Sequence, residues 1–319
     1  MNSFWHSLPQ PFFVLAPMEA VTDVVFRHVI KEAGAPDVWF TEFTNATGWT
    51  HAGNKAIGGR LIKTDDESPI VAQLWGSDAD AMTKLSVHCA ELGYDGIDIN
   101  MGCPDSSAVK SGGGAGMIRT PERAYEMIVA AKTSGLPVSV KTRLGYSSVD
   151  EWHDWLKGIL EQDIAVLTVH LRTKKEMSKV PAHFELIPAI KQLRDTVAPD
   201  TLLVINGDVK DRSHGLEFVN AHGVDGVMIG RGIFANPFAF CHETNTQRDK
   251  QELLNLLRYH MGLYDTYSEM THRPFETLKR FFKIYIRDFD GASDLRDRLM
   301  HTKTTDEARL VLDTITFDS

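Results

Sequence analysis

The chain has 319 residues, 43% hydrophobic and 24% charged, which is the composition of a globular protein with a large core rather than of a disordered or fibrous chain. Its net charge of −9 gives no overall basic footprint for nucleic acid, although a local basic face is compatible with that sum. Three cysteines far apart in sequence, with no CxxC pair, argue against a disulfide framework or a thiolate metal site, so we predict no metal centre.

The amino-terminal segment and the cysteines both bear on where the protein works. Residues 1–20 contain no basic region, and proline breaks their apolar run, so we expect no signal peptide. No stretch approaches the roughly 18 apolar residues of a membrane span. Because sparse cysteines fit a reducing compartment, we expect a cytoplasmic protein with no membrane partner.

Eight short apolar runs, each followed by a helical pattern except the last, occupy the first three quarters of the chain. Near-continuous apolar strands covered by helices are typical of a parallel sheet. Eight such units predict an α/β protein with a TIM (β/α)8 barrel, the alternative being a doubly wound open sheet. The runs are residues 12–18, 38–43, 69–76, 96–104, 137–145, 165–172, 202–209 and 226–232.

The pattern changes after residue 240. Residues 241–250 are polar and are predicted to be a linker. Amphipathic helical patterns with no strand signal follow, at 252–270, 274–289, 292–302 and 305–315. We therefore predict a barrel domain at 1–240 and a small all-helical domain at 251–319.

Polar residues stand at the end of every predicted strand. In a barrel of this kind the active site lies at the carboxyl ends of the strands, so these residues are predicted to converge on one mouth. They are Pro17, Met18, Glu19, Glu42, Gln73, Asn100, Cys103, Lys141, Arg143, His170, Arg172, Asn206, Gly207, Asp208, Gly230 and Arg231.

The last two strands are followed by the glycine-containing turns "NGD" (206–208) and "GRGIFANP" (230–237). This is where such barrels commonly bind a phosphate through backbone N–H groups, and Arg231 adds a fixed cation. The alternative is two tight turns that merely require glycine. We predict a phosphorylated ligand across the mouth.

Lys141 is open to three interpretations from the residues alone. It can form a Schiff base, as in an aldolase-like lyase. It can place positive charge beside the N1/O2 edge of a flavin and stabilise the anionic reduced ring. It can also be an ordinary strand-end lysine in an ion pair. A Schiff-base lysine needs a depressed pKa, with which Arg143 and His170 are compatible, so the residues alone do not choose between the roles.

The ordered motifs of the chain resemble those of the tRNA-dihydrouridine synthases, which are FMN enzymes with a TIM barrel and a C-terminal helical domain. The resemblance covers nearly the whole chain. It is carried by "APMEAVTDVVFR", "VAQLWG", "DINMGCPDSSAVKSGGGAGMI", "VSVKTRLGY", "VHLRT", "VINGD" and "GVMIGRGIFANP".

The resemblance implies a role for each matching residue. Pro17, Met18 and Glu19 correspond to the backbone lip against the isoalloxazine, and Gln73 to an amide that hydrogen-bonds the ring. Lys141 corresponds to the lysine at the N1/O2 edge, and His170 to another flavin contact. Cys103 matches the catalytic cysteine, and Asn100 a residue beside the substrate base. The ribityl-phosphate segments correspond to Asn206, Gly207, Asp208, Gly230 and Arg231. Leu171 and Ala20 depart from the family pattern, where glycine is common, and leave substrate choice open.

The implied reaction gives Cys103 a chemical purpose. Reduced flavin delivers hydride from N5 to C6 of uridine, and a proton must then reach C5. We expect the Cys103 thiol to supply it, since an unperturbed thiol with a pKa of about 8.5 is mostly protonated at neutral pH. The alternative is a small buried hydrophobe. Residues 111–116, "SGGGAG", are predicted to form a lid or a plain flexible loop.

Two basic groups are predicted to bind tRNA. In 273–287 the spacing lets several cations share a helix face, the alternative being an ordinary solvated face. A second group lies at the mouth. The first group is Arg273, Lys279, Arg280, Lys283 and Arg287, and the second is Arg172, Lys174, Lys175 and Lys179. Arg143, at the end of its strand, is also assigned to RNA.

The leading prediction is thus an FMN-dependent oxidoreductase that makes dihydrouridine in tRNA, with NADPH as reductant, acting as a monomer. Three alternatives remain from the residues: a flavin enzyme for a free pyrimidine, a Schiff-base lyase, and a non-catalytic RNA-binding module. No motif fixes which tRNA position is reduced.

Overall fold

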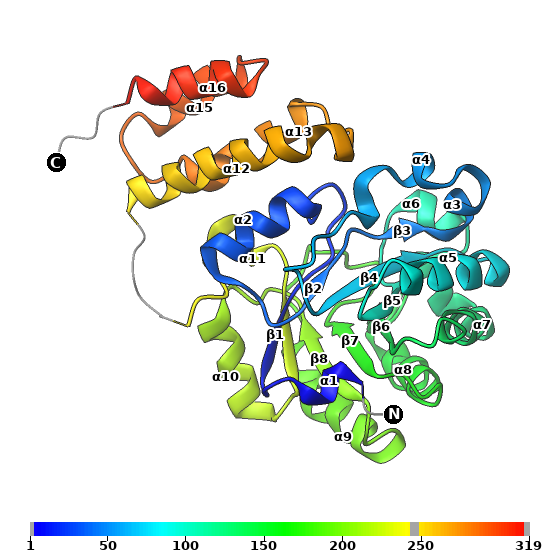
Figure 1. Cartoon of the computed structure of the whole chain (residues 1–319). Coiled ribbons are helices and arrows are strands. Elements are labelled where there is room, and N and C mark those ends of the chain that lie inside the picture. The colour runs from blue at the N-terminus through cyan, green and yellow to red at the C-terminus, as the bar shows by residue number, and fades with distance from the viewer. Residues whose placement is uncertain (1–2, 243–248, 316–319) are drawn as a thin grey trace.

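The computed structural model describes residues 3–242 and 249–315, and its larger part is a barrel of eight parallel strands (Figure 1). The hydrogen-bonded order is β1-β9-β8-β7-β6-β5-β4-β2, and the parallel bridge between Val14 and Val38 joins the two ends. The short strand β3 also pairs with β4. The strands are β1 (Phe12–Leu15), β2 (Trp39–Phe40), β3 (Thr44–Asn45), β4 (Ile70–Trp75), β5 (Gly96–Met101), β6 (Val138–Arg143), β7 (Val166–His170), β8 (Leu202–Asn206) and β9 (Gly226–Ile229). The predicted TIM barrel and its eight strands are confirmed.

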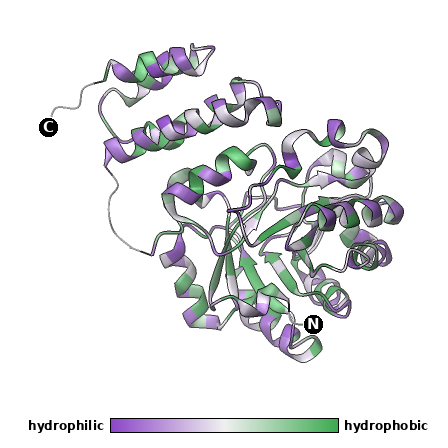
Figure 2. Cartoon of the chain, in the orientation of Figure 1, coloured by the Kyte–Doolittle hydropathy of each residue, from purple (hydrophilic) through white to green (hydrophobic). Residues whose placement is uncertain are grey.

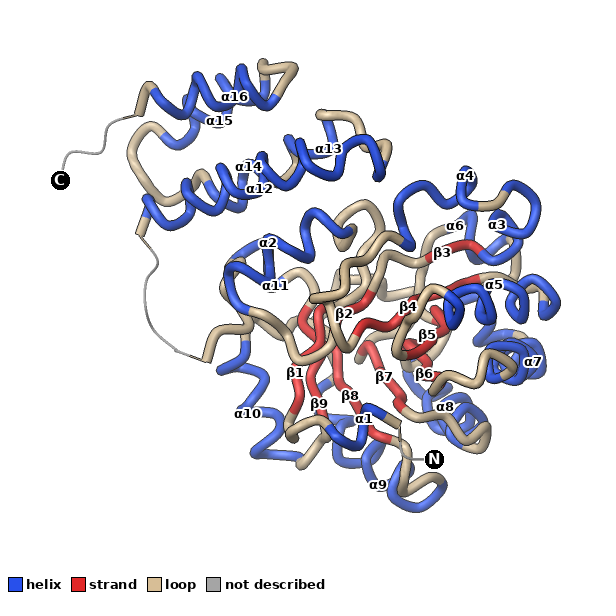
Figure 3. The backbone as a smooth tube through the Cα atoms, in the orientation of Figure 1, coloured by secondary structure: helices blue, strands red, loops and turns tan. Residues whose placement is uncertain are grey.

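Helices surround this barrel, as the tube in Figure 3 shows with strands in red and helices in blue. Several begin at an aspartate whose carboxylate accepts a backbone N–H of the first turn, namely Asp23, Asp78 and Asp211. The outer helices are α2 (Val24–Gly34), α5 (Ala79–Glu91), α7 (Pro121–Lys132), α8 (Trp152–Leu160), α9 (Ile187–Val197) and α10 (Arg212–His222). Shorter segments are α3 (Ala46–Ala52), α4 (Asn54–Ile57), α6 (Ser106–Lys110), α11 (Gly232–Ala235) and the 3₁₀ turns η1 (Gly58–Leu61), η2 (Gly114–Arg119), η3 (Val149–Glu151) and η4 (Phe184–Leu186).

The core has two layers because side chains alternate across each strand. Phe13, Leu15 and their equivalents pack outward against the helices, whereas Phe12, Val14 and Val71 fill the barrel interior. Trp5, from the short helix α1 (Phe4–Ser7), closes the interior at the amino ends of the strands. Figure 2 shows the resulting hydrophobic centre in green, with more polar helices outside.

The interior changes from apolar to polar along the strands. Val71 is followed by Gln73 on β4, Val166 by His170 on β7, and Val204 by Asn206 on β8. This gradient concentrates hydrogen-bonding groups at the carboxyl end of the barrel, where the predicted site residues lie.

Helices follow the barrel at the carboxyl side of the chain: α12 (Lys250–Thr271), α13 (Glu276–Lys279), α14 (Phe282–Tyr285), α15 (Ala292–Met300) and α16 (Thr305–Asp313). Helix α12 packs against α2, and the ring of Phe281 stacks on Phe26 of α2 at a centroid distance of 4.6 Å. One hydrophobic cluster therefore continues from barrel to helices. Residues 243–248 of the predicted linker lie outside the described residues, and the two-domain division stays a prediction.

The prediction of one helix over 274–289 was wrong. The chain forms α13 and α14 instead, because the backbone N–H groups of Leu278, Phe281 and Ile284 bond to carbonyls three residues earlier. Phe275, Phe281, Phe282 and Tyr285 of this segment are buried. Lys279 and Lys283 consequently lie in two different short helices rather than on one.

No helix in residues 3–242 and 249–315 is long and apolar enough to cross a membrane. The same residues contain no cluster of three or more potential metal ligands.

Candidate active site at the carboxyl end of the barrel

A cavity of about 420 Å³ opens at the carboxyl end of the barrel. It collects every predicted cofactor residue except Glu19 and Gln73. The predicted residues that line it are Pro17, Met18, Lys141, His170, Asn206, Gly207, Asp208, Gly230 and Arg231. Glu19 is turned to an ion pair with Arg60, and Gln73 is fully buried in the barrel interior.

One side of the cavity is built to hold an anion. The backbone N–H groups of Gly207, Asp208 and Arg231 have no acceptor in the described part of the chain. Gly207 has a φ of +120°, and a Cβ added there would approach the His170 ring to 3.1 Å, so only glycine suits this turn. Free backbone donors beside an exposed arginine are what a phosphate group requires.

A buried arginine organises this side of the cavity. Arg172 donates to the Asp208 carboxylate, to Val180 O at 2.6 Å and to His170 Nε2 at 3.2 Å. Because a guanidinium only donates, His170 Nε2 accepts and the ring proton lies on Nδ1. Burial, with the nearby arginines and Lys141, holds the pKa of His170 well below its usual value, so the ring is neutral. Arg172 was assigned to RNA from the sequence; its side chain is 2% exposed and lies in this cluster.

Lys141 projects from β6 into the cavity. Its ammonium forms no hydrogen bond to any described residue, so it remains available to a ligand. Burial, with Arg143 nearby, lowers the pKa of Lys141 to about 8. The group is thus still largely cationic at neutral pH.

A row of three polar side chains, here called the amide chain (Asp98, Gln73 and Asn100), crosses the interior beneath Cys103. Gln73 Nε2 donates to Asp98 Oδ2 at 2.7 Å, and Asn100 Nδ2 donates to Gln73 Oε1 at 3.0 Å. Ser139 Oγ donates to the other Asp98 oxygen at 2.6 Å. Burial raises the pKa of Asp98 to about 6. Asp98 was missed from the sequence, although an aspartate in the middle of the apolar strand "GIDINM" is itself a signal.

The turn that carries Cys103, residues 100–105, is held from three directions. Asn100 Oδ1 accepts the N–H groups of Gly102 and Cys103 at 3.1 and 2.9 Å. Arg143 Nε donates to Gly102 O at 2.7 Å. Ala115 N donates to Cys103 O at 2.9 Å.

The glycine-rich segment after this turn is packed rather than open. Gly114 is buried, with a φ of +52°, and a Cβ there would lie 2.8 Å from Cys103 O. The segment continues into η2, and Gly114 packs against the backbone of Cys103.

Cys103 itself is partly exposed. Burial is the largest influence on it and raises the pKa of its thiol, against opposing effects from Arg143 and Lys141. A raised pKa favours the protonated thiol at neutral pH, which is the form that can donate a proton, over the thiolate form of a nucleophilic cysteine. Cys89, on α5, is fully buried.

The lip of the cavity is tied to the C-terminal helices. Ala20 has a φ of +57°, which explains why glycine is common at this position. Its N–H donates to buried Glu42, and its carbonyl accepts from Arg280 Nη1 at 2.8 Å. Glu42 also accepts from Arg273 Nη2 at 2.6 and 2.8 Å.

The residues assigned to RNA are found in different settings. Arg273 is in the Glu42 ion pair, Arg143 bonds three backbone carbonyls, and Lys279 bonds Met300 O at 3.0 Å. Lys174 lies over the Tyr146 ring at 4.9 Å. Arg280, Lys283 and Lys175 are exposed. The charges of these exposed residues are therefore accessible to an RNA phosphate.

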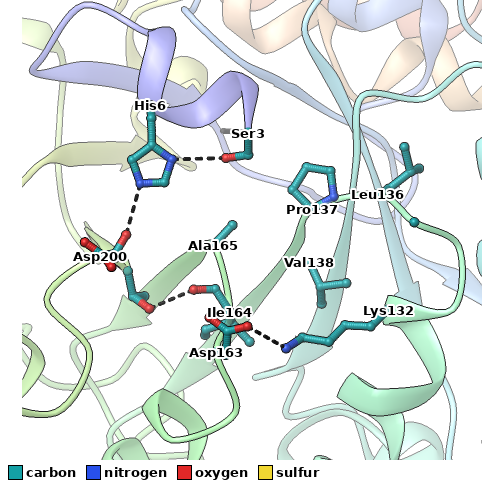
Figure 4. Close-up of a pocket in the computed structure, with 12 residues that line it drawn as sticks. Ser3, His6, Lys132, Leu136, Pro137, Val138, Asp163, Ile164, Ala165 and Asp200 are labelled. Carbon is teal, nitrogen blue, oxygen red and sulfur yellow. Dashed lines mark hydrogen bonds and ion pairs between the residues drawn. The ribbon is translucent and has the colours of Figure 1, made fainter. Parts of the chain in front are cut away.

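A second cavity, of about 540 Å³, lies at the opposite, amino end of the barrel (Figure 4). Its polar groups already have partners. His6 contacts Ser3 Oγ and Asp200 O, and Lys132 donates to Gln162 O. This end of a barrel contributes stability rather than chemistry.

The fold and the site together define a class: a TIM-barrel enzyme with an anion-binding cavity at the barrel mouth, a lysine on its wall that has no hydrogen bond to a described residue, and a partly exposed cysteine on a nearby turn. Comparisons with known proteins narrow this class. The sequence profile of the dihydrouridine synthase (Dus) family matches residues 14–318. The chain belongs to the dihydrouridine synthase family.

Two relatives are similar over nearly their whole length. The probable tRNA-dihydrouridine synthase 2 of Bacillus subtilis is 60% identical over 98% of this chain and 96% of its own. A probable tRNA-dihydrouridine synthase of Staphylococcus epidermidis is 57% identical over the same shares. Histamine dehydrogenase from Rhizobium sp. 4-9 gives 12% identity and a TM-score of 0.49, over 79% of this chain and 48% of its own, and a score this low carries no argument.

FMN is the cofactor of this family, with NAD(P)H as reductant. The residues present fit FMN: free backbone donors and Arg231 suit its phosphate, and the unbonded Lys141 ammonium suits an anionic ring. Family membership therefore favours the flavin interpretation of Lys141 over the Schiff base.

Proposed function

We propose that this protein is an FMN-dependent oxidoreductase that reduces the C5=C6 bond of uridine in tRNA to 5,6-dihydrouridine, with NADPH as reductant. The observation that carries the proposal is the partly exposed Cys103, on a turn held by hydrogen bonds from three directions, near a cavity whose wall supplies anion-binding donors and a lysine. A thiol placed for nucleophilic attack would have a lowered pKa, whereas the pKa of Cys103 is raised.

Bound FMN, once reduced, supplies the hydride that C6 of the uracil ring receives. The protein residues then have three tasks. Gly207, Asp208, Gly230 and Arg231 would bind the phosphate of FMN, and Lys141 would supply positive charge to its ring. Cys103 donates its proton to C5, where negative charge develops. Asn100 holds the turn, so the thiol keeps its direction while the base enters.

The substrate base must leave its stack in folded RNA to reach a barrel mouth. We assign the exposed cations Arg280, Lys283 and Lys175 to the RNA phosphates, which supply much of the affinity in such complexes. Arg280 contacts the lip at Ala20, so it lies where RNA must pass. We further propose that the enzyme acts in the cytoplasm as a monomer, with the C-terminal helices as its tRNA-binding part.

Nucleoside analysis of tRNA from cells with and without the gene tests the function. Cells that carry the gene should contain one uridine heavier by two hydrogens, and the fragment that contains it identifies the position. Purified protein should be yellow and should restore the modification in tRNA from the deleted strain when NADPH is added. A colourless protein that cannot take up FMN would overturn the proposal.

A further inference from the structure

The amide chain has only one consistent direction. Backbone N–H groups can only donate, so Asn100 must turn its oxygen toward Gly102 and Cys103. Its amino group then faces Gln73, which must present its oxygen there. The Gln73 amino group is left for Asp98, and an ionised carboxylate can only accept. The two ends of the chain therefore demand the same orientation.

Asp98 is the fixed end of this arrangement. It is fully buried in the middle of β5, and its two oxygens accept from Ser139 on β6 and Gln73 on β4. It thus joins three adjacent strands inside the barrel, at a level just below the reacting thiol. Asp98 is 0% and Ser139 1% exposed, whereas Cys103 is partly exposed, so both lie at a depth that a ligand does not reach.

We propose that Asp98 is a positioning residue for Cys103: acting through Gln73 and Asn100, it fixes the orientation of both amides and hence the turn that carries the thiol. The proposal rests on the proposed function only for the proton-donor role of Cys103. Without Asp98, the buried Gln73 amide can rotate, and Asn100 loses its fixed partner.

Alkylation of the FMN-loaded enzyme tests the geometry directly. Iodoacetamide labelling of Cys103 is followed by peptide mass analysis, and fully buried Cys89 reports global opening in the same sample. In Asp98→Ala we expect the rate at Cys103 to rise about fivefold while Cys89 is unchanged, because only the turn is loosened.

The variant Asp98→Asn distinguishes a requirement for a hydrogen-bond acceptor at residue 98 from a requirement for its negative charge. In Asp98→Asn the amide oxygen still accepts from Gln73, and its amino group faces the Ser139 hydroxyl, which can accept. Asp98→Asn should therefore label like the wild type, and so should Ser139→Ala, which leaves the bonds from Asp98 to Asn100 in place.

Kinetics give a second readout. Asp98→Ala should lower kcat for tRNA about tenfold to a hundredfold, because small misplacements of a reacting group are costly, with KM for tRNA changed less than about twofold. FMN content, measured from absorbance, normalises each preparation.

A reciprocal swap covers the case in which Asp98→Ala does not fold. Gln73→Glu places two carboxylates face to face and should raise Cys103 labelling. In the double variant Gln73→Glu with Asp98→Asn, the new amino group at position 98 can donate to the new carboxylate at position 73. The rate of Cys103 labelling should then return to within about twofold of the wild-type rate.

The proposal is overturned if Asp98→Ala leaves Cys103 labelling unchanged or raises Cys89 equally, if Asp98→Asn behaves like Asp98→Ala, or if the swap gives no rescue. Failure of the proposed function looks different: the wild-type enzyme would then not reduce tRNA, whereas the labelling contrasts would remain.

Discussion

Arg273 and Glu42 form an ion pair that fastens the C-terminal helices to the mouth of the barrel. Both Glu42 oxygens accept from Arg273 Nη2, at 2.8 and 2.6 Å, across 231 positions of the chain. Glu42 is fully buried and also accepts the N–H of Ala20, in the lip of the cavity. Glu42 therefore connects the C-terminal helices, through Arg273, to the lip of the cavity at Ala20.

Removing Arg273 should destabilise the protein in a pH-dependent manner. Burial raises the pKa of Glu42, while Arg273 lowers it, so Arg273→Met raises that pKa further. A raised carboxyl pKa means that stability is retained at low pH and lost as pH rises through the folded-state value. We expect a loss of about 3 kcal/mol at pH 8, because a buried charge is left unpaired, and a smaller loss at pH 5.

Chemical denaturation at both pH values measures this effect. Arg280→Met is the control, since Arg280 is exposed and bonds only one carbonyl, and it should cost less than about 1 kcal/mol at either pH. Equal losses for Arg273→Met at pH 5 and pH 8 would contradict a role for the Glu42 charge.

Replacing Cys103 should stop proton delivery without releasing FMN. Cys103→Ala is expected to retain the flavin spectrum and to lose about a hundredfold or more in tRNA turnover, which is the usual contribution of a general acid. Because the thiol pKa is raised, the wild-type rate should stay flat through neutral pH and fall only above the usual thiol value of about 8.5. Single-turnover rates between pH 6.5 and 9.5 check this, and a fall beginning below pH 7.5 would exclude the thiol as donor.

Arg231 should distinguish FMN from riboflavin. It is 60% exposed, so its removal disturbs the fold little, and it lies beside the free backbone donors of the cavity. Arg231→Ala should weaken FMN about tenfold, the value of one charge-assisted hydrogen bond, and should leave riboflavin affinity nearly unchanged. Fluorescence titration measures both affinities. An equal loss of affinity for FMN and riboflavin would mean that Arg231 does not bind the phosphate.

Gly114 should be required for the support of Cys103. Alanine there combines a left-handed φ of +52° with a Cβ only 2.8 Å from Cys103 O, so we expect a loss of about 2 kcal/mol and a large drop in turnover. Gly135→Ala is matched to it, since φ is +76° but nothing lies within 4 Å. It should show the conformational cost alone and keep full activity. If Gly135→Ala lost activity as well, the contact with Cys103 would not be the cause.

The exposed cations near the lip should contribute to tRNA affinity. Arg280→Glu with Lys283→Glu should weaken binding, and the slope of log K against log salt should fall by about one for each phosphate that the protein no longer neutralises. The flavin spectrum should not change. Lys84→Glu, on the exposed side of α5, serves as the control for general charge. Unchanged affinity in the double variant would place the RNA on another face.

The eight strands and the cavity were predictable because their signals are local. Each strand is a continuous apolar run, and the turns after β8 and β9 carry glycines where the backbone must approach a ligand. The order of the motifs was also sufficient to identify the family. The role predicted for Cys103 comes from the same motifs, because the residues of its turn are contiguous in sequence, and it stays a prediction.

What the sequence by itself determined was the barrel, its polar mouth and the chemistry gathered there, since short stretches encode all three. Only the tertiary structure decided which polar groups satisfy one another. The partnership of Asp98 with Gln73 and that of Arg273 with Glu42 depend on residues far apart in the chain. Burial makes each of those pairings obligatory, because a polar group removed from water must find its partner in space, wherever that partner lies in sequence.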